Sequence, residues 1–71
     1  MFNWDDMRYF LELARRNKLS KAALRLGVEH TTVARRITAL ESKLNLTLFE
    51  RKNRSYQLTD DGRRLLTHAE A

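Results

Sequence analysis

The stretch that decides the fold is SKAALRLGVEHTTVARRITALESKL, from Ser20 to Leu44. Its first part predicts a short helix over residues 20–26, which Ser20 caps and Gly27 ends. After a turn over residues 27–30, a longer helix is expected over residues 31–44. The longer helix carries one apolar stripe, made by Val33, Ile37, Leu40 and Leu44. Two helices joined by so short a turn predict a helix-turn-helix over about residues 20–44.

The face opposite this stripe is polar and basic. At about 100° per residue, the side chains that point away from the stripe are Thr31, Arg35, Thr38 and Ser42. Such a face suits the major groove of DNA, where arginine pairs with guanine and threonine contacts a phosphate or a thymine methyl. A charged outward face is also ordinary for a solvated helix, so Arg35 and Arg36 alone do not decide between the two readings. The preceding short helix and turn favour DNA binding.

The segment before the helix-turn-helix predicts a first helix over residues 4–16, with Asn3 as its N-cap and Asn17 as its left-handed stop. The apolar face of this helix is expected to comprise Trp4, Met7, Phe10, Leu11 and Ala14. We expect Trp4, Phe10 and Phe49 to lie in the core, because the first two sit on that apolar face and Phe49 begins the next element.

After the helix-turn-helix, the apolar residues no longer follow the spacing of a helix. Residues 48–51 and 56–58 predict two short strands joined by a polar turn over residues 52–55. The hairpin is basic, since Arg51, Lys52 and Arg54 lie close together and a turn does not need their charges. Tyr56 either packs on the hairpin or offers its hydroxyl to a phosphate. Thr59 is expected to cap a fourth helix.

These elements together predict a mainly α fold over residues 1–59, a winged helix-turn-helix with a three-helix core and a small β-hairpin wing. Residues 60–71 are interpreted as the start of a C-terminal linker or dimerisation helix, whose apolar side carries Leu65, Leu66 and Ala69. Because the chain ends before this helix could fold back over a core, we expect these side chains to be partly exposed and to pack on a second copy.

Composition excludes several classes of protein. A chain of 71 residues without cysteine forms no disulfide and no thiolate metal site, and His30 and His68 are its only imidazoles. No metal or other cofactor is therefore expected. The chain contains no membrane-spanning run and no signal peptide, so a cytoplasmic protein is expected.

The charged residues indicate a binding protein and not an enzyme. The adjacent carboxylates at residues 5–6 and 60–61 lie at predicted helix N-termini, where the helix dipole explains them without any acid–base chemistry. So short a chain also leaves little room for a substrate pocket. The net charge is +5, yet residues 1–14 hold one arginine against three carboxylates. The positive excess after residue 14 indicates a polyanionic partner.

Through a set of residues that follow one another in a specific order, the sequence resembles the N-terminal domain of the LysR-type transcriptional regulators of bacteria. The matching residues are Ala22-Ala23, Leu26, the run VARRI from Val33 to Ile37, Leu40-Glu41, Leu48-Phe49, Arg51, Leu58-Thr59 and Gly62. The resemblance implies a nucleoid-associated transcription factor that dimerises through its fourth helix. It also implies a small-molecule effector, sensed by a C-terminal domain that is absent here. His30 stands where the family often has glutamine, and Ala34 stands where it often has serine.

The predicted DNA-binding residues are Ser20, His30, Thr31, Thr32, Arg35, Arg36, Arg51 and Arg54. We expect Ser20, Thr31 and Thr32 to anchor phosphates through hydroxyls and helix N-terminal amides. Contacts to base edges are expected of His30, Thr31 and Arg35. Arg36 and Arg51 are expected at the DNA backbone, and Arg54 at a phosphate or in the adjacent minor groove.

The predicted partner is double-stranded DNA, bound by a homodimer on an inverted-repeat site. Two alternatives remain open on the sequence alone. The wing and the longer helix of the helix-turn-helix would bind another protein in the first, and a structured RNA would be the partner in the second.

Overall fold

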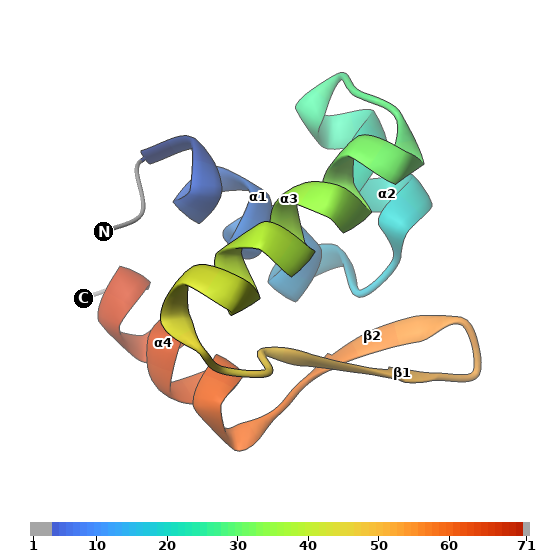
Figure 1. Ribbon diagram of the computed structural model, residues 1–71. Coiled ribbons are helices and arrows are strands. Elements are labelled where there is room, and N and C mark those ends of the chain that lie inside the picture. Colours follow the sequence, from blue (N-terminus) through green and yellow to red (C-terminus); the bar gives the residue numbers. More distant parts are fainter. Residues whose placement is uncertain (1–3, 71) are drawn as a thin grey trace.

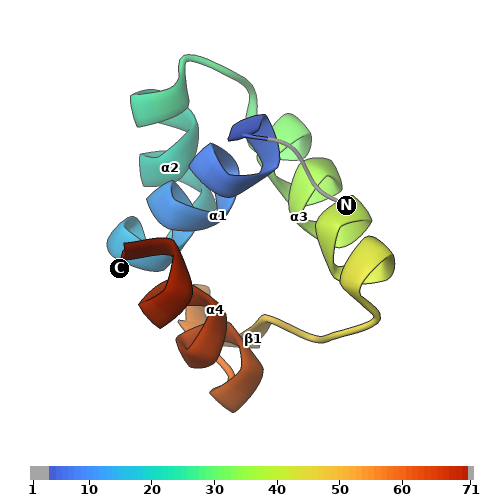
Figure 2. The ribbon, with the colours of Figure 1, turned by 90° about the vertical axis from the view of Figure 1, so that its left-hand side faces the viewer.

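The computed structural model describes residues 4–70 and confirms the predicted mainly α winged helix-turn-helix (Figure 1). Its elements, in chain order, are α1 (Trp4–Arg16), α2 (Leu19–Leu26), α3 (His30–Leu44), β1 (Phe49–Lys52), β2 (Ser55–Leu58) and α4 (Asp60–Glu70). The predicted N-cap Asn3 lies outside the described residues. Figure 2 shows α1 between α2 and α3, with α4 below it.

The core lies where α1, α2 and α3 meet the start of the wing. Its largest fully buried side chains are Phe10, Leu13, Val33, Leu40 and Leu48. The side of α2 that faces this core is lined by alanines 22 and 23, which are both buried, and small side chains let neighbouring helices approach closely. The apolar stripe predicted on α3 is the face that packs inward.

The predicted core position of Trp4 is wrong, because its side chain is 71% exposed. The buried face of α1 is centred on Asp6, Tyr9, Phe10 and Leu13, and at about 100° per residue Trp4 points away from this face. The sequence pattern misplaced the face because two polar residues, Asp6 and Tyr9, are buried on it. Phe10 and Phe49 are buried as predicted, and their ring centroids lie 5.5 Å apart.

The helix starts of the helix-turn-helix differ from the sequence prediction. α2 begins at Leu19, and Lys18 occupies the N-cap with no side-chain cap hydrogen bond among residues 4–70. The predicted capping role of Ser20 is therefore wrong, since Ser20 lies inside the first turn. The helix reaches back to Leu19 because that side chain packs against the core. α3 likewise begins at His30, one residue earlier than predicted.

The helix ends were predicted correctly. Asn17, Gly27 and Asn45 follow α1, α2 and α3 with φ of 67°, 71° and 56°, all left-handed. Asparagine and glycine are the residues that adopt this conformation most readily. Each helix is thus stopped at the residue that its sequence marks.

The wing is an antiparallel hairpin in which Phe49 pairs with Leu58 and Lys52 pairs with Ser55. The turn consists of Asn53 and Arg54 alone, with φ of 50° and 67°. It is shorter than the predicted turn over residues 52–55, because two left-handed residues in succession match the twist of the strands and let them pair up to the tip.

Two residues, Asn17 after α1 and Glu41 on α3, hold the wing through hydrogen bonds. Asn17 accepts a hydrogen bond at its main-chain oxygen from the Tyr56 N–H (2.7 Å), and its Nδ2 donates to the Tyr56 carbonyl oxygen (2.9 Å). The Glu41 carboxylate on α3 accepts hydrogen bonds from the N–H groups of Leu48 (2.7 Å) and Phe49 (3.3 Å). The wing is therefore held against both ends of the helix-turn-helix.

The start of α4 depends on a close approach between chain segments. The Thr59 hydroxyl accepts a hydrogen bond from the Gly62 N–H (3.0 Å), which confirms the predicted cap. At Gly62, a Cβ atom would lie 2.2 Å from the Leu48 carbonyl oxygen and 2.8 Å from Leu58 Cδ2. Only glycine fits this contact without moving the backbone.

Gly62→Ala should lower the free energy of unfolding by about 2–3 kcal/mol, because the added methyl group overlaps backbone that cannot move aside cheaply. Urea denaturation followed by circular dichroism measures the loss. Gly27→Ala is the matched control, since a Cβ there meets no atom within 4 Å and only the left-handed φ is strained, at about 1 kcal/mol. A smaller loss at residue 62 than at residue 27 would contradict the steric argument.

Candidate nucleic-acid interface

The outward face of α3 is the first part of the interface. Thr31, Arg35 and Thr38 are exposed on the side opposite the buried Val33 and Ile37. Arg35 forms no ion pair with any residue of the described range 4–70. Its guanidinium donors therefore remain available to a partner in solution.

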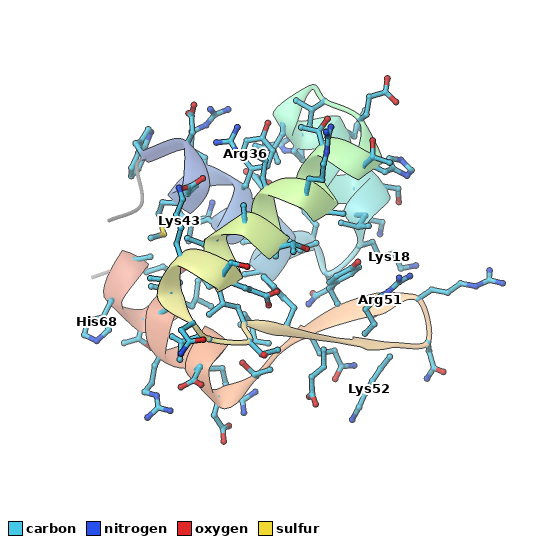
Figure 3. The ribbon with its side chains drawn as sticks, in the orientation of Figure 1. Lys18, Arg36, Lys43, Arg51, Lys52 and His68 are labelled. Carbon is cyan, nitrogen blue, oxygen red and sulfur yellow. The ribbon has the colours of Figure 1, made fainter. Side chains whose placement is uncertain are left out.

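The flank of α3 that faces α1 is organised differently. Arg36 Nη2 lies 3.4 Å from Asp6 Oδ1, and the Arg36 Cζ atom lies 4.6 Å from the centroid of the Tyr9 ring. Lys43 Nζ lies 2.9 Å from Asp6 Oδ2, and the Asp6 side chain is only 5% exposed. Figure 3 shows Arg36 and Lys43 along the side of α3 that borders α1. Arg36 thus serves the packing of α3 on α1, and a contact between Arg36 and the DNA backbone stays a prediction.

A basic cleft lies between the start of α2, the start of α3 and the wing. It has a volume of about 320 Å³, and the residues that line it are Lys18, Leu19, Ser20, His30, Arg51, Arg54 and Tyr56. We call it the basic cleft, because no carboxylate is among its lining residues. The cleft brings together Ser20, His30, Arg51 and Arg54, whereas the other predicted DNA-binding residues lie on α3 outside it.

Lys18 is the cationic residue of the basic cleft that was not predicted from the sequence. In Figure 3, Lys18 and Arg51 lie beside each other between the α1–α2 connection and the wing. The sequence contains a basic residue before α2, but its proximity to the wing depends on the pairing of Asn17 with Tyr56, which are 39 positions apart. Arg51 also stacks on Tyr56, with its Cζ atom 5.3 Å from the ring centroid.

The other side of the wing has mixed charge. A hollow of about 630 Å³ lies between this side of the wing and the start of α4, and its lining includes Glu50, Lys52, Asp60, Asp61 and Arg63. Lys52 points to this side, away from Lys18 and Arg51 (Figure 3). A polyanion is therefore favoured on one side of the hairpin and opposed on the other.

The predicted dimerisation residues Leu65, Leu66 and Ala69 are half-buried on α4. Leu65 and Leu66 pack against the core of their own chain, so the expectation that α4 cannot fold back over a core is wrong. Arg15 on α1 and Glu70 on α4 also approach each other at 3.9 Å. The helix folds back because Gly62 brings it into contact with the segment at Leu48.

Within residues 4–70, neither the acidic residues at the helix starts nor a group of metal-ligating side chains forms a second candidate site. Asp5 pairs with Arg8 (3.0 Å) and Asp61 pairs with Arg64 (2.6 Å), each with a residue three positions on. Within residues 4–70, no three histidine, cysteine or acidic side chains are grouped as a metal site would require. None of the helices in this range combines the length and the apolarity needed to cross a membrane.

Comparison with known families gives a match over most of the chain. The family described as "Bacterial regulatory helix-turn-helix protein, lysR family" matches residues 4–63. Similar proteins include the "Transcriptional dual regulator GltC" of Bacillus subtilis (strain 168), which is 44% identical over 63 residues, or 89% of this chain and 21% of that protein. A "Probable hydrogen peroxide-inducible genes activator" of Mycobacterium xenopi is 40% identical over 65 residues, or 92% of this chain and 34% of that protein. The chain thus spans only about a fifth to a third of the length of these relatives.

Solved structures show the same fold. A CbnR_DBD–DNA complex superposes with a TM-score of 0.92 at 32% identity, covering 97% of this chain and 79% of that one. A complex of BenM_DBD with benA site 1 DNA gives a TM-score of 0.91 at 28% identity, covering 97% and 80%.

Arg36→Ala should lower the free energy of unfolding by about 1–2 kcal/mol, because it removes one cation from the buried Asp6 carboxylate and the stack on Tyr9. Arg35→Ala, one position earlier and fully outward, should change it by about 0.5 kcal/mol at most. Urea denaturation of both variants gives the comparison. Equal effects would mean that Arg36 is a surface residue like its neighbour.

Proposed function

Because this chain belongs to the lysR family of bacterial regulatory helix-turn-helix proteins, we propose that it binds duplex DNA in a sequence-specific manner. In this proposal α3 enters the major groove and the wing contacts the backbone or the minor groove. The observation that carries the proposal is the outward face of α3, next to the basic cleft, where Thr31 and Arg35 are exposed and Arg35 has no ion pair within residues 4–70.

The geometry of α3 supports direct contact with bases. An α-helix fits the major groove, where an arginine fork pairs with the O6 and N7 atoms of guanine. In this proposal Arg35 makes this contact, and Thr31 and His30 lie about one turn nearer the start of the helix. Arg54, at the tip of the wing, carries its charge toward a phosphate or the adjacent minor groove.

The relatives support a role in transcription for a longer protein. The CbnR and BenM structures are complexes with DNA, and GltC is described as a transcriptional regulator. We infer that this domain directs such a regulator to its site, at the nucleoid in the cytoplasm. An effector-sensing domain beyond this chain belongs to the same proposal, and DNA recognition of this kind uses no catalytic group.

Two alternatives make different predictions, namely a protein-interaction module and an RNA-binding domain. Binding driven by phosphates should weaken steeply with salt. The slope of log K against the logarithm of the salt concentration should be about −0.9 for each phosphate neutralised on duplex DNA. An apolar protein interface would respond little to salt. An RNA duplex offers a deep, narrow major groove that excludes α3.

Titration of the domain with a selected duplex DNA, a random duplex and a duplex RNA over a salt series should give tight binding to the first and weaker binding to the others. Fluorescence anisotropy measures each affinity. Arg35→Ala should cost about 1–3 kcal/mol on the selected duplex and much less on random DNA, since a base contact is lost. Preference for RNA, or insensitivity to salt, would reject the proposal.

We also propose that two copies bind an inverted repeat, with their α4 helices side by side. The half-buried Ala69 is the best probe, because Leu65 and Leu66 already pack in their own core. Ala69→Asp should weaken binding to a palindrome more than binding to a half-site. The exposed Thr67, changed to aspartate on the same helix, is the control for charge. Light scattering that finds one protein on each saturated palindrome would refute the dimer.

A further inference from the structure

The basic cleft lies where the helix-turn-helix and the wing meet, the two units that contact DNA in the proposed function. We propose that it holds a single phosphate of the DNA backbone, bound jointly by Lys18 and Arg51, so that both units are fastened to the same phosphate. The inference rests on the proposed function and adds to it a defined ligand position and a residue, Lys18, that the sequence did not assign.

The charge of the basic cleft fits a phosphate diester. Lys18, Arg51 and Arg54 contribute three positive charges to its lining, to which no carboxylate belongs. Arginine offers a planar fork to two phosphate oxygens, and lysine adds a compact point charge. The hydroxyl groups of Ser20 and Tyr56 are further donors in the same lining. The hollow on the other side of the wing, with Glu50, Asp60 and Asp61, lacks this character.

The position of Lys18 relative to Arg51 is fixed by a short chain of contacts. Lys18 follows Asn17, which forms two hydrogen bonds with Tyr56, at 2.7 and 2.9 Å. Arg51 is the cross-strand partner of Tyr56 and lies over its ring. The backbones that carry the two cations are thus joined through one pair of residues.

This connection is the reason to expect one shared phosphate. Cations on mobile segments lose conformational freedom on binding, whereas a cleft that is already assembled loses less. The α1–α2 connection supplies one cation and strand β1 of the wing supplies the other. A phosphate bound between them would therefore also set the distance of α3 from the DNA backbone. The phosphate bound by Lys18 and Arg51 would then also fix the position from which Arg35 contacts a base.

A scan with single methylphosphonates, which neutralise one backbone phosphate at a time, tests the inference on a bound half-site. For the unchanged domain, one position on the wing side should weaken binding by about tenfold, which corresponds to about 1.4 kcal/mol. Lys18→Gln and Arg51→Gln should each remove most of the sensitivity at that same position and leave the other positions unchanged. Lys18→Arg should retain it.

Lys52→Gln is the matched control, because Lys52 neighbours Arg51 but lies on the other side of the wing. Lys52→Gln should leave the sensitivity at every phosphate position as in the unchanged domain. The altered side chains are all exposed, so thermal unfolding should show that every variant stays folded. Loss of sensitivity at two different phosphates for Lys18→Gln and Arg51→Gln would overturn the shared site while leaving DNA binding intact. Failure of the unchanged domain to bind any duplex would instead reject the proposed function.

Discussion

The burial of one stripe of α3 is the constraint from which the rest of the structure follows. A helix is rigid about its axis, so once Val33, Ile37 and Leu40 are buried, the direction of every other side chain on it is set. Arg35 must then face outward. Arg36 and Glu41 lie on opposite flanks, where Arg36 meets the Asp6 carboxylate of α1 and Glu41 receives the backbone N–H groups of the segment that enters the wing. The packing of one surface of α3 thus exposes its outward face, holds α1 in place and positions the hairpin.

The features that could be predicted from the sequence are those that local chemistry decides. Asn17, Gly27 and Asn45 end helices because left-handed backbone suits them, and Thr59 caps α4 through its own hydroxyl. The inward face of α1 could not be read in the same way. Its centre includes Asp6, a carboxylate whose side chain is buried beside Arg36 and Lys43 of α3, and no pattern within α1 reveals those two partners.

In the candidate site too, the features set by local sequence could be predicted, and those set by contacts between distant segments could not. The outward position of Arg35 follows from helical spacing, so it could be predicted from the sequence. The basic cleft could not, because it depends on the contact between the α1–α2 connection and β2, two segments far apart in the chain. Ser20, His30, Arg51 and Arg54 were predicted one by one, for separate reasons, and the hydrogen bonds of Asn17 bring them into one place together with Lys18.

At the tip of the wing, a strained backbone conformation and a positive charge fall on the same residue, Arg54. Arg54 adopts a φ of 67°, a conformation that costs a side-chain-bearing residue about 1–2 kcal/mol relative to glycine. Glycine at this position would make the hairpin more stable and would remove the cation at its tip. A search for more heat-resistant variants that ignored DNA would therefore be drawn to residue 54 and would discard the positive charge at the tip of the hairpin. Under the proposed function, the most stable hairpin and the hairpin best suited to binding DNA therefore differ at residue 54.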